Sequence, residues 1–168
     1  SEARVHRLAN ELLKELEPHL ASLTLEQLGD IALSCKAMSS PEMQLGKRDL
    51  VAKLADAAAT RECLDQDSVD GLSRITHLLI LREQYSPTLF EALEHRVLTN
   101  KLVECPQSYA NVLLAFAELD PARQQAMATL VRAIADSKVK LDCASRQRVA
   151  KGITRLDYSS PSTAAILL

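Results

Sequence analysis

Residues 109–120 read YANVLLAFAELD, and Pro121 follows directly. Similar stretches occupy residues 28–39 and 149–156, and a shorter match lies at residues 72–75. All four copies hold a small residue at their second position: Gly29, Ser73, Ala110 and Ala150. Because a small side chain at one fixed position lets a neighbouring helix approach closely, we expect the copies to form helices that pack in the same way.

Four of the six prolines follow a residue that commonly caps a helix: Ser40-Pro41, Ser86-Pro87, Asp120-Pro121 and Ser160-Pro161. A Ser or Asp side chain accepts a hydrogen bond from the first helical turn, and proline suits the first helical position. Each pair therefore predicts a helix start. The pairs recur about every 40 residues, the length of a two-helix repeat. The alternative is that the matching stretches are a chance similarity between helices rich in Leu and Ala. The recurrence of the proline pairs argues against it, because it does not depend on those stretches.

Apolar residues between the prolines recur at helical spacing, and no segment alternates for long with the period of a strand. Thr24 and Gln27 form a capping box before the second expected helix. The expected helices occupy residues 2–16, 24–38, 41–60, 68–84, 87–99, 106–118, 121–136 and 143–156, with a short one from residue 161. We expect one all-α domain over residues 1–168, a right-handed α-solenoid of about four helix-turn-helix repeats. A compact helical bundle is the alternative.

Composition narrows the class of protein. The chain has 168 residues, of which 47% are hydrophobic and only 3% aromatic, and its net charge is −2. This apolar content excludes a disordered chain. No apolar run approaches the length that crosses a bilayer, so we expect no membrane insertion. The slightly acidic balance provides no general attraction for nucleic acid.

The residue pattern predicts a protein that is not an enzyme. The four histidines are scattered without the Cys, Ser or carboxylate partners of a catalytic site, and no glycine-rich phosphate loop is present. The four cysteines lack the tight spacing of zinc ligands, so we expect reduced thiols, no metal and no cofactor. His77 lies among apolar residues and is expected to be a partly buried helix residue. A small helical enzyme stays open only if folding gathers titratable residues in a pocket.

The last repeat is basic although the chain as a whole is not. Between residues 138 and 155 there is one acid and there are six basic residues, which we take as candidate partner-binding residues: Lys138, Lys140, Arg146, Arg148, Lys151 and Arg155. Helical spacing brings the last three of these to one face. That face is either a solvated surface, a docking patch for an acidic protein or a site for RNA phosphates.

The C-terminal residues Ile166, Leu167 and Leu168 complete the candidate partner-binding set. The Ser160-Pro161 pair opens a further repeat that ends in these apolar residues. The end of a solenoid normally needs a polar cap. We therefore expect the segment either to fold back onto the preceding helices or to bury against a partner.

The segment Gln107–Leu119, preceded by the expected helix that contains Pro87–Leu93, resembles the repeats of pentatricopeptide, octotricopeptide and FAST-kinase-like organellar proteins. Most members of these families bind single-stranded RNA in mitochondria and plastids. The repeats here are few and unevenly spaced, and the chain is small and slightly acidic. In these respects it is similar to the small additional subunits on the catalytic head of euglenozoan mitochondrial ATP synthase, which are protein-binding solenoids.

This resemblance implies a non-catalytic protein-interaction subunit of a mitochondrial complex. The most specific expectation is an accessory subunit bound to the α subunit of the ATP synthase catalytic head, where it supports assembly or stability and takes no small-molecule substrate. Its location would be the matrix side of an inner-membrane-associated complex. Because the chain begins at Ser1, we expect that a targeting peptide has been removed. The alternative is an organellar repeat protein that binds single-stranded RNA.

Overall fold

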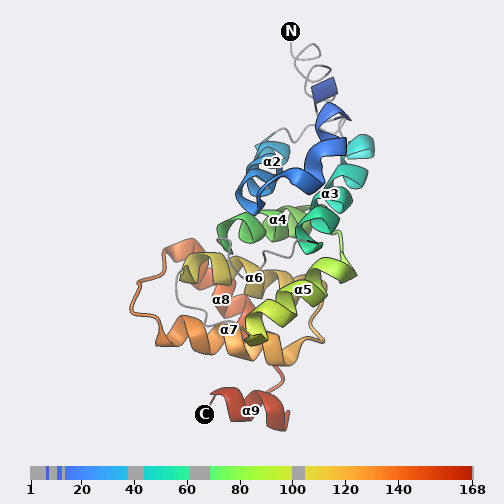
Figure 1. Cartoon of the computed structure of the whole chain (residues 1–168). Coiled ribbons are helices and arrows are strands. Elements are labelled where there is room, and N and C mark those ends of the chain that lie inside the picture. Colours follow the sequence, from blue (N-terminus) through green and yellow to red (C-terminus); the bar gives the residue numbers. More distant parts are fainter. Residues whose placement is uncertain are drawn as a thin grey trace.

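The computed structural model describes Arg7, Glu11, Leu12 and residues 14–37, 44–60, 69–99 and 105–167. Regular structure within these residues is entirely helical, which confirms the predicted all-α class. Figure 1 shows the elements following one another from the first 3₁₀ helix at one end to the last α-helix at the other. The elements are η1 (Glu17–Ser22), α2 (Leu25–Ala37), α3 (Gln44–Ala59), α4 (Val69–Arg82), α5 (Pro87–Thr99), α6 (Pro106–Leu119), α7 (Gln124–Asp136), α8 (Cys143–Thr154) and α9 (Pro161–Leu167).

Two of the proline-based helix starts are confirmed. Helices α5 and α9 begin at Pro87 and Pro161, as predicted. The Ser86 hydroxyl accepts a long hydrogen bond of 3.4 Å from the backbone N–H of Leu89. Ser86 therefore satisfies a donor of the first turn that has no partner within the helix.

The capping box before α2 is confirmed as well. The Thr24 N–H donates to Gln27 Oε1 at 2.8 Å, and the Gln27 N–H donates to Thr24 Oγ1 at 3.2 Å. These reciprocal bonds satisfy two backbone donors at the helix start. The predicted start at Ser40-Pro41 and most of the predicted helix over residues 2–16 lie outside the described residues.

The helix start predicted at Asp120-Pro121 is wrong. Pro121 lies in a turn, and α7 begins three residues later at Gln124. The Asp120 carboxylate is engaged elsewhere, because its Oδ2 accepts hydrogen bonds from the Tyr85 hydroxyl and from Arg123 Nε, each at 2.7 Å. The Asp120 N–H also donates to the Phe116 carbonyl at 2.9 Å. Asp120 therefore ends α6 and does not begin α7.

The helices alternate between two layers. Layer A consists of α2, α4, α6 and α8, and each of these helices packs against the next. Layer B consists of η1, α3, α5, α7 and α9, which contact one another in the same sequential way. Figure 1 shows this succession down the length of the molecule. Alternate packing of this kind is what a stack of helical hairpins requires. The right-handed α-solenoid itself stays a prediction.

Glycines let the first two helices of layer A approach closely. A Cβ atom on Gly29 would lie 2.7 Å from the Cα atom of Gly71. A Cβ atom on Gly71 would lie only 2.1 Å from the carbonyl oxygen of Leu25. The contact between α2 and α4 is therefore one of backbone against backbone, and it leaves no room for a side chain at either position.

The small-residue position predicted from the repeats holds in three of the four copies. Gly29, Ser73 and Ala110 are buried, whereas Ala150 is exposed. In α8 the close contact is made at Gly152, where a Cβ atom would lie 2.5 Å from Leu113 Cγ. Because residues two apart on a helix point in different directions, the prediction for Ala150 is wrong.

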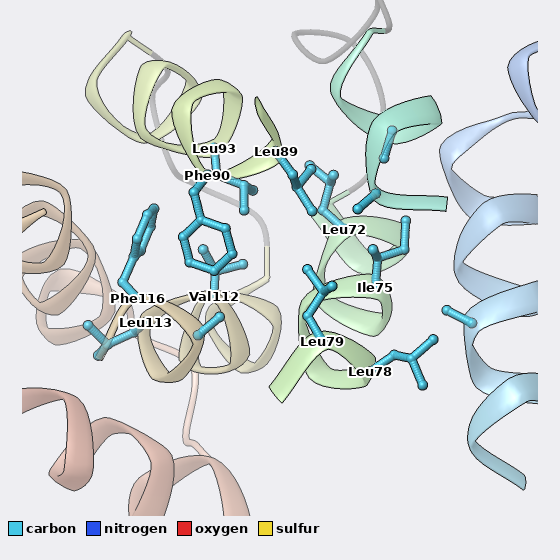
Figure 2. Packing of buried hydrophobic residues seen from close by; sticks show 14 of the residues in the cluster. Leu72, Ile75, Leu78, Leu79, Leu89, Phe90, Leu93, Val112, Leu113 and Phe116 are labelled. Atoms are coloured by element: carbon cyan, nitrogen blue, oxygen red, sulfur yellow. The ribbon is translucent and has the colours of Figure 1, made fainter. Parts of the chain in front are cut away.

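The largest buried side chains join the two layers. Phe90 of α5 and Phe116 of α6 are fully buried, and their ring centroids lie 5.4 Å apart at an interplanar angle of 87°. Figure 2 shows the two rings beside each other, with the leucines of α4 and α5 nearby. Such an edge-to-face pair contributes about 0.5–1.5 kcal/mol beyond the burial of its area. The few aromatic residues thus include the pair that fixes α5 against α6.

Candidate functional site

A cavity of about 170 Å³ lies where the four helices of layer A meet. Each helix of the layer contributes to its wall, although the residues are far apart in the sequence. The lining residues are Ala32, Leu33 and Lys36 of α2, Arg74 and His77 of α4, Asn111 of α6 and Arg148 of α8.

Polar contacts between neighbouring helices position two of the lining residues. Arg74 of α4 forms an ion pair with Asp30 of α2. Asn111 Nδ2 of α6 donates a hydrogen bond of 2.5 Å to Ser73 Oγ of α4. The other amide atom, Asn111 Oδ1, is buried and has no hydrogen-bond partner. The cavity wall therefore contains a polar group that the protein itself does not satisfy.

The surroundings of His77 favour the neutral form of its imidazole. Burial lowers the pKa of its imidazole, and the positive charges of Lys36 and Arg148 lower it further. Lys36 Nζ lies 3.1 Å from His77 Nε2. Since an ammonium group can only donate, Nε2 is the acceptor and the imidazole proton sits on Nδ1. That Nδ1 is buried and has no hydrogen-bond partner.

The cavity is electropositive. Lys36, Arg74 and Arg148 bring three cations to its wall, and no carboxylate lines it. Asp30 balances Arg74, but no carboxylate of the described residues lies within ion-pair distance of Arg148. A partly buried cation without an opposite charge loses hydration and gains no ion pair in return. This arrangement favours an anionic group in the cavity.

The structure separates the six basic residues that the sequence grouped together. Only Arg148 lines the cavity. Lys151 lies 4.0 Å from Glu118 of α6, and Arg155 is exposed just beyond the end of α8. Arg146 is exposed on α8, and Lys138 and Lys140 are exposed on the segment between α7 and α8.

The C-terminal apolar residues fold back, which was one of the two expectations. Helix α9 packs against α7, and Ile166 and Leu167 are half-buried against the hydrophobic core. Arg132 Nη1 of α7 also donates a hydrogen bond of 2.5 Å to the carbonyl oxygen of Ile166. Leu168 lies outside the described residues.

Arg148 was among the residues predicted to bind a partner, whereas Lys36 and Arg74, the other charged residues of the cavity, were not. No charge pattern in the sequence marks Lys36 and Arg74, and they meet because α2 packs against α4. His77 is half-buried in a helix, as predicted, although its place in a cationic cavity was not foreseen. One feature of the sequence does relate two of the lining residues: Arg74 and Asn111 both occupy the third position of a repeat copy, directly after the small residue.

Among the described residues, no helix is long and apolar enough to cross a membrane, and no group of His, Cys, Asp or Glu could hold a metal ion. The three described cysteines differ in exposure: Cys35 is buried, Cys105 half-buried and Cys143 exposed. No protein-family model, no curated protein and no solved structure matches the chain.

Proposed function

We propose that the chain is a non-catalytic subunit that binds another protein within a larger mitochondrial assembly. The observation that carries this proposal is the cavity of layer A, whose wall contains Lys36, Arg74 and Arg148, with Arg74 paired to Asp30 of α2. Stacked helical hairpins offer an extended surface to protein partners, and complementary charge selects and orients them. The exposed Lys138, Lys140 and Arg155 near the last repeat would add to this charge.

The chemistry of the cavity wall supports a binding role over a catalytic one. The wall contains no carboxylate, thiol or hydroxyl group, and the amine of Lys36 in the wall is a nucleophile only without its proton, whereas it donates to His77 Nε2. His77 is the one lining residue that could exchange a proton near neutral pH, but its Nε2 already accepts from Lys36. A general base needs its acceptor nitrogen directed at the substrate. Binding of an anionic group is what remains for these residues to do.

In its most specific form, the proposal is an accessory subunit on the α subunit of the mitochondrial ATP synthase catalytic head, where it supports assembly or stability. This form rests on the resemblance of Gln107–Leu119 to pentatricopeptide-type repeats and on the small size of the chain. Alternate stacking of helices in two layers is compatible with that resemblance. The mitochondrial location rests on the same resemblance.

A second candidate function is the binding of single-stranded RNA. The cations of layer A favour it, because phosphates attract Lys and Arg. RNA-binding sites of this kind also stack bases on aromatic side chains. No aromatic residue lines the cavity, and the exposed Tyr85 and Tyr158 lie outside its wall. The first proposal therefore fits the cavity better.

Purification of the tagged full chain from its own cells distinguishes the two functions. A stable subunit is expected to bring the same proteins at a fixed stoichiometry, and to retain them through a high-salt wash. RNA binding would instead weaken steeply as salt is raised, since each phosphate contact releases counterions. Recovery of the chain as a free monomer that binds single-stranded RNA tightly at physiological salt would overturn the proposal.

A further inference from the structure

The volume of the cavity limits what it can hold. Sites for small molecules usually measure about 300–1,000 Å³, whereas this cavity measures about 170 Å³. It is therefore too small to enclose a nucleotide. One short side chain is an occupant of suitable size.

The polar groups of the wall select for negative charge. Arg148 has no ion-pair partner among the described residues, and the planar guanidinium of Arg74 keeps N–H groups beyond those facing Asp30. A guanidinium group can donate two parallel hydrogen bonds to the two oxygens of a carboxylate. An acidic side chain would give Arg148 a direct ion pair, in addition to the more distant attraction between Arg148 and the Asp142 carboxylate at the start of α8.

The remaining wall is apolar and partly open to solvent. Ala32 and Leu33 line the same cavity, and the Leu33 side chain is 50% exposed although it is a large hydrophobic residue. These residues suit the methylene groups of a glutamate and an apolar neighbour of that glutamate in a partner chain. A phosphate group has no such apolar stem.

We propose that the cavity between α2, α4, α6 and α8 is a recognition pocket for a single carboxylate side chain of a protein partner, held by Arg148 together with Arg74 and Lys36. The inference deepens the proposed function and rests on it, because it names the chemistry by which the partner is recognised. The partner segment carries a glutamate or aspartate beside an apolar residue that contacts Leu33.

Fluorescence anisotropy of the full chain tests the pocket directly. Three labelled probes are compared. The Glu peptide repeats the sequence Glu-Leu-Ala, the Gln peptide has Gln in place of every Glu, and the third probe is an oligouridylate. We expect the wild-type chain to bind the Glu peptide at least about tenfold more tightly than the Gln peptide, because a charge-assisted contact is lost. Arg148→Gln should weaken binding of the Glu peptide by a similar factor.

Arg146→Gln is the matched control. It removes the same charge from the same helix, but Arg146 is exposed and does not line the cavity. Its affinity for the Glu peptide should stay within about twofold of the wild-type value, since an exposed charge acts weakly at physiological salt. Circular dichroism establishes that both variants are folded. An equal loss in the two variants would overturn the proposal, and so would tighter binding of oligouridylate that depends on Arg148.

Nuclear magnetic resonance of His77 in the wild-type chain provides a readout that needs no variant at the binding residues. The His77→Gln spectrum assigns its imidazole signals. A carboxylate in the cavity would offset the charges that act on His77, which are those of Lys36 of α2 and Arg148 of α8; Arg74, on the same helix as His77, lines the same cavity. We expect the Glu peptide, but not the Gln peptide, to shift the His77 titration to higher pH.

An unchanged His77 titration under saturating Glu peptide would contradict the inference. Failure of the pocket and failure of the proposed function are distinguishable. Absent peptide binding in a chain that still co-purifies with proteins at fixed stoichiometry would refute the pocket alone, whereas a chain that brings no protein partner from its cells would refute the function.

Discussion

Replacement of Gly71 by alanine tests the closest helix contact of the fold. The new Cβ atom would lie 2.1 Å from the Leu25 carbonyl oxygen and 2.6 Å from its carbonyl carbon. Even a close C···O contact needs about 3.3 Å, so α2 and α4 must separate by about 1 Å at this point. Overpacking costs about 1–3 kcal/mol, and a backbone obstacle belongs at the upper end of that range. Alanine recovers about 1 kcal/mol through its helix propensity.

The expected net loss of stability for Gly71→Ala is therefore about 2 kcal/mol. For a chain of this length, that corresponds to a fall in Tm of about 4–8 °C. Urea and thermal unfolding followed by far-ultraviolet circular dichroism measure both quantities. A variant as stable as the wild type, or more stable by the propensity of alanine, would show that α2 and α4 do not approach as closely as described.

Gly152→Ala is the matched comparison because its obstacle is a side chain. The Cβ atom there would lie 2.5 Å from Leu113 Cγ. In the double variant Gly152→Ala/Leu113→Ala, the loss of stability should be smaller than the sum of the losses in the two single variants, because the smaller side chain at residue 113 makes room for the new methyl group. Gly71→Ala combined with Leu25→Ala should show no such recovery, because the obstacle at Gly71 is main chain.

Three further predictions concern pH, the core and a helix cap. The lowered pKa of His77 means that the unfolded chain takes up a proton near pH 6.5 before the folded chain does, so stability falls as pH drops through that value. His77→Gln should reduce this fall, and equal urea-unfolding midpoints above and below pH 6.5 in the wild type would contradict the sign. Phe116→Ala should destabilise the chain by about 3–5 kcal/mol, whereas Tyr158→Ala, at a residue that is 57% exposed, should change it by about 0.5 kcal/mol or less. A similar loss in the two unfolding experiments would refute the assigned core. Thr24→Ala should cost about 1 kcal/mol through loss of the bond to the Gln27 N–H, measured by the same unfolding assay.

Local signals in the sequence predicted the helices well. The starts at Pro87 and Pro161 and the capping box of Thr24 depend only on residues a few positions apart, so they are readable without the fold. The start at Asp120-Pro121 failed for a tertiary reason. Tyr85, on the segment before α5, donates to the Asp120 carboxylate that a cap would need.

The cavity could not be predicted because it depends on how helices are rotated in their layer. Arg148 belongs to the run of basic residues between residues 138 and 155, but it is the one residue of that run that lines the cavity. No charge pattern links Lys36 with Arg74, and they meet through the packing of α2 against α4, which includes the close backbone contact at Gly71. A two-residue error in helix phase, as at Ala150, is enough to exchange a buried position for an exposed one.

The most direct measurement is native mass spectrometry of the assembly that is purified with the full chain from its own cells. We expect a complex in which the chain is present at a fixed whole-number ratio to protein subunits, without a nucleic-acid component. Substitution of Arg148 by Gln should lower the fraction of chain found in that complex, and substitution of Arg146 should not. A wild-type chain recovered only as a monomer, or only bound to RNA, would contradict a protein-binding function.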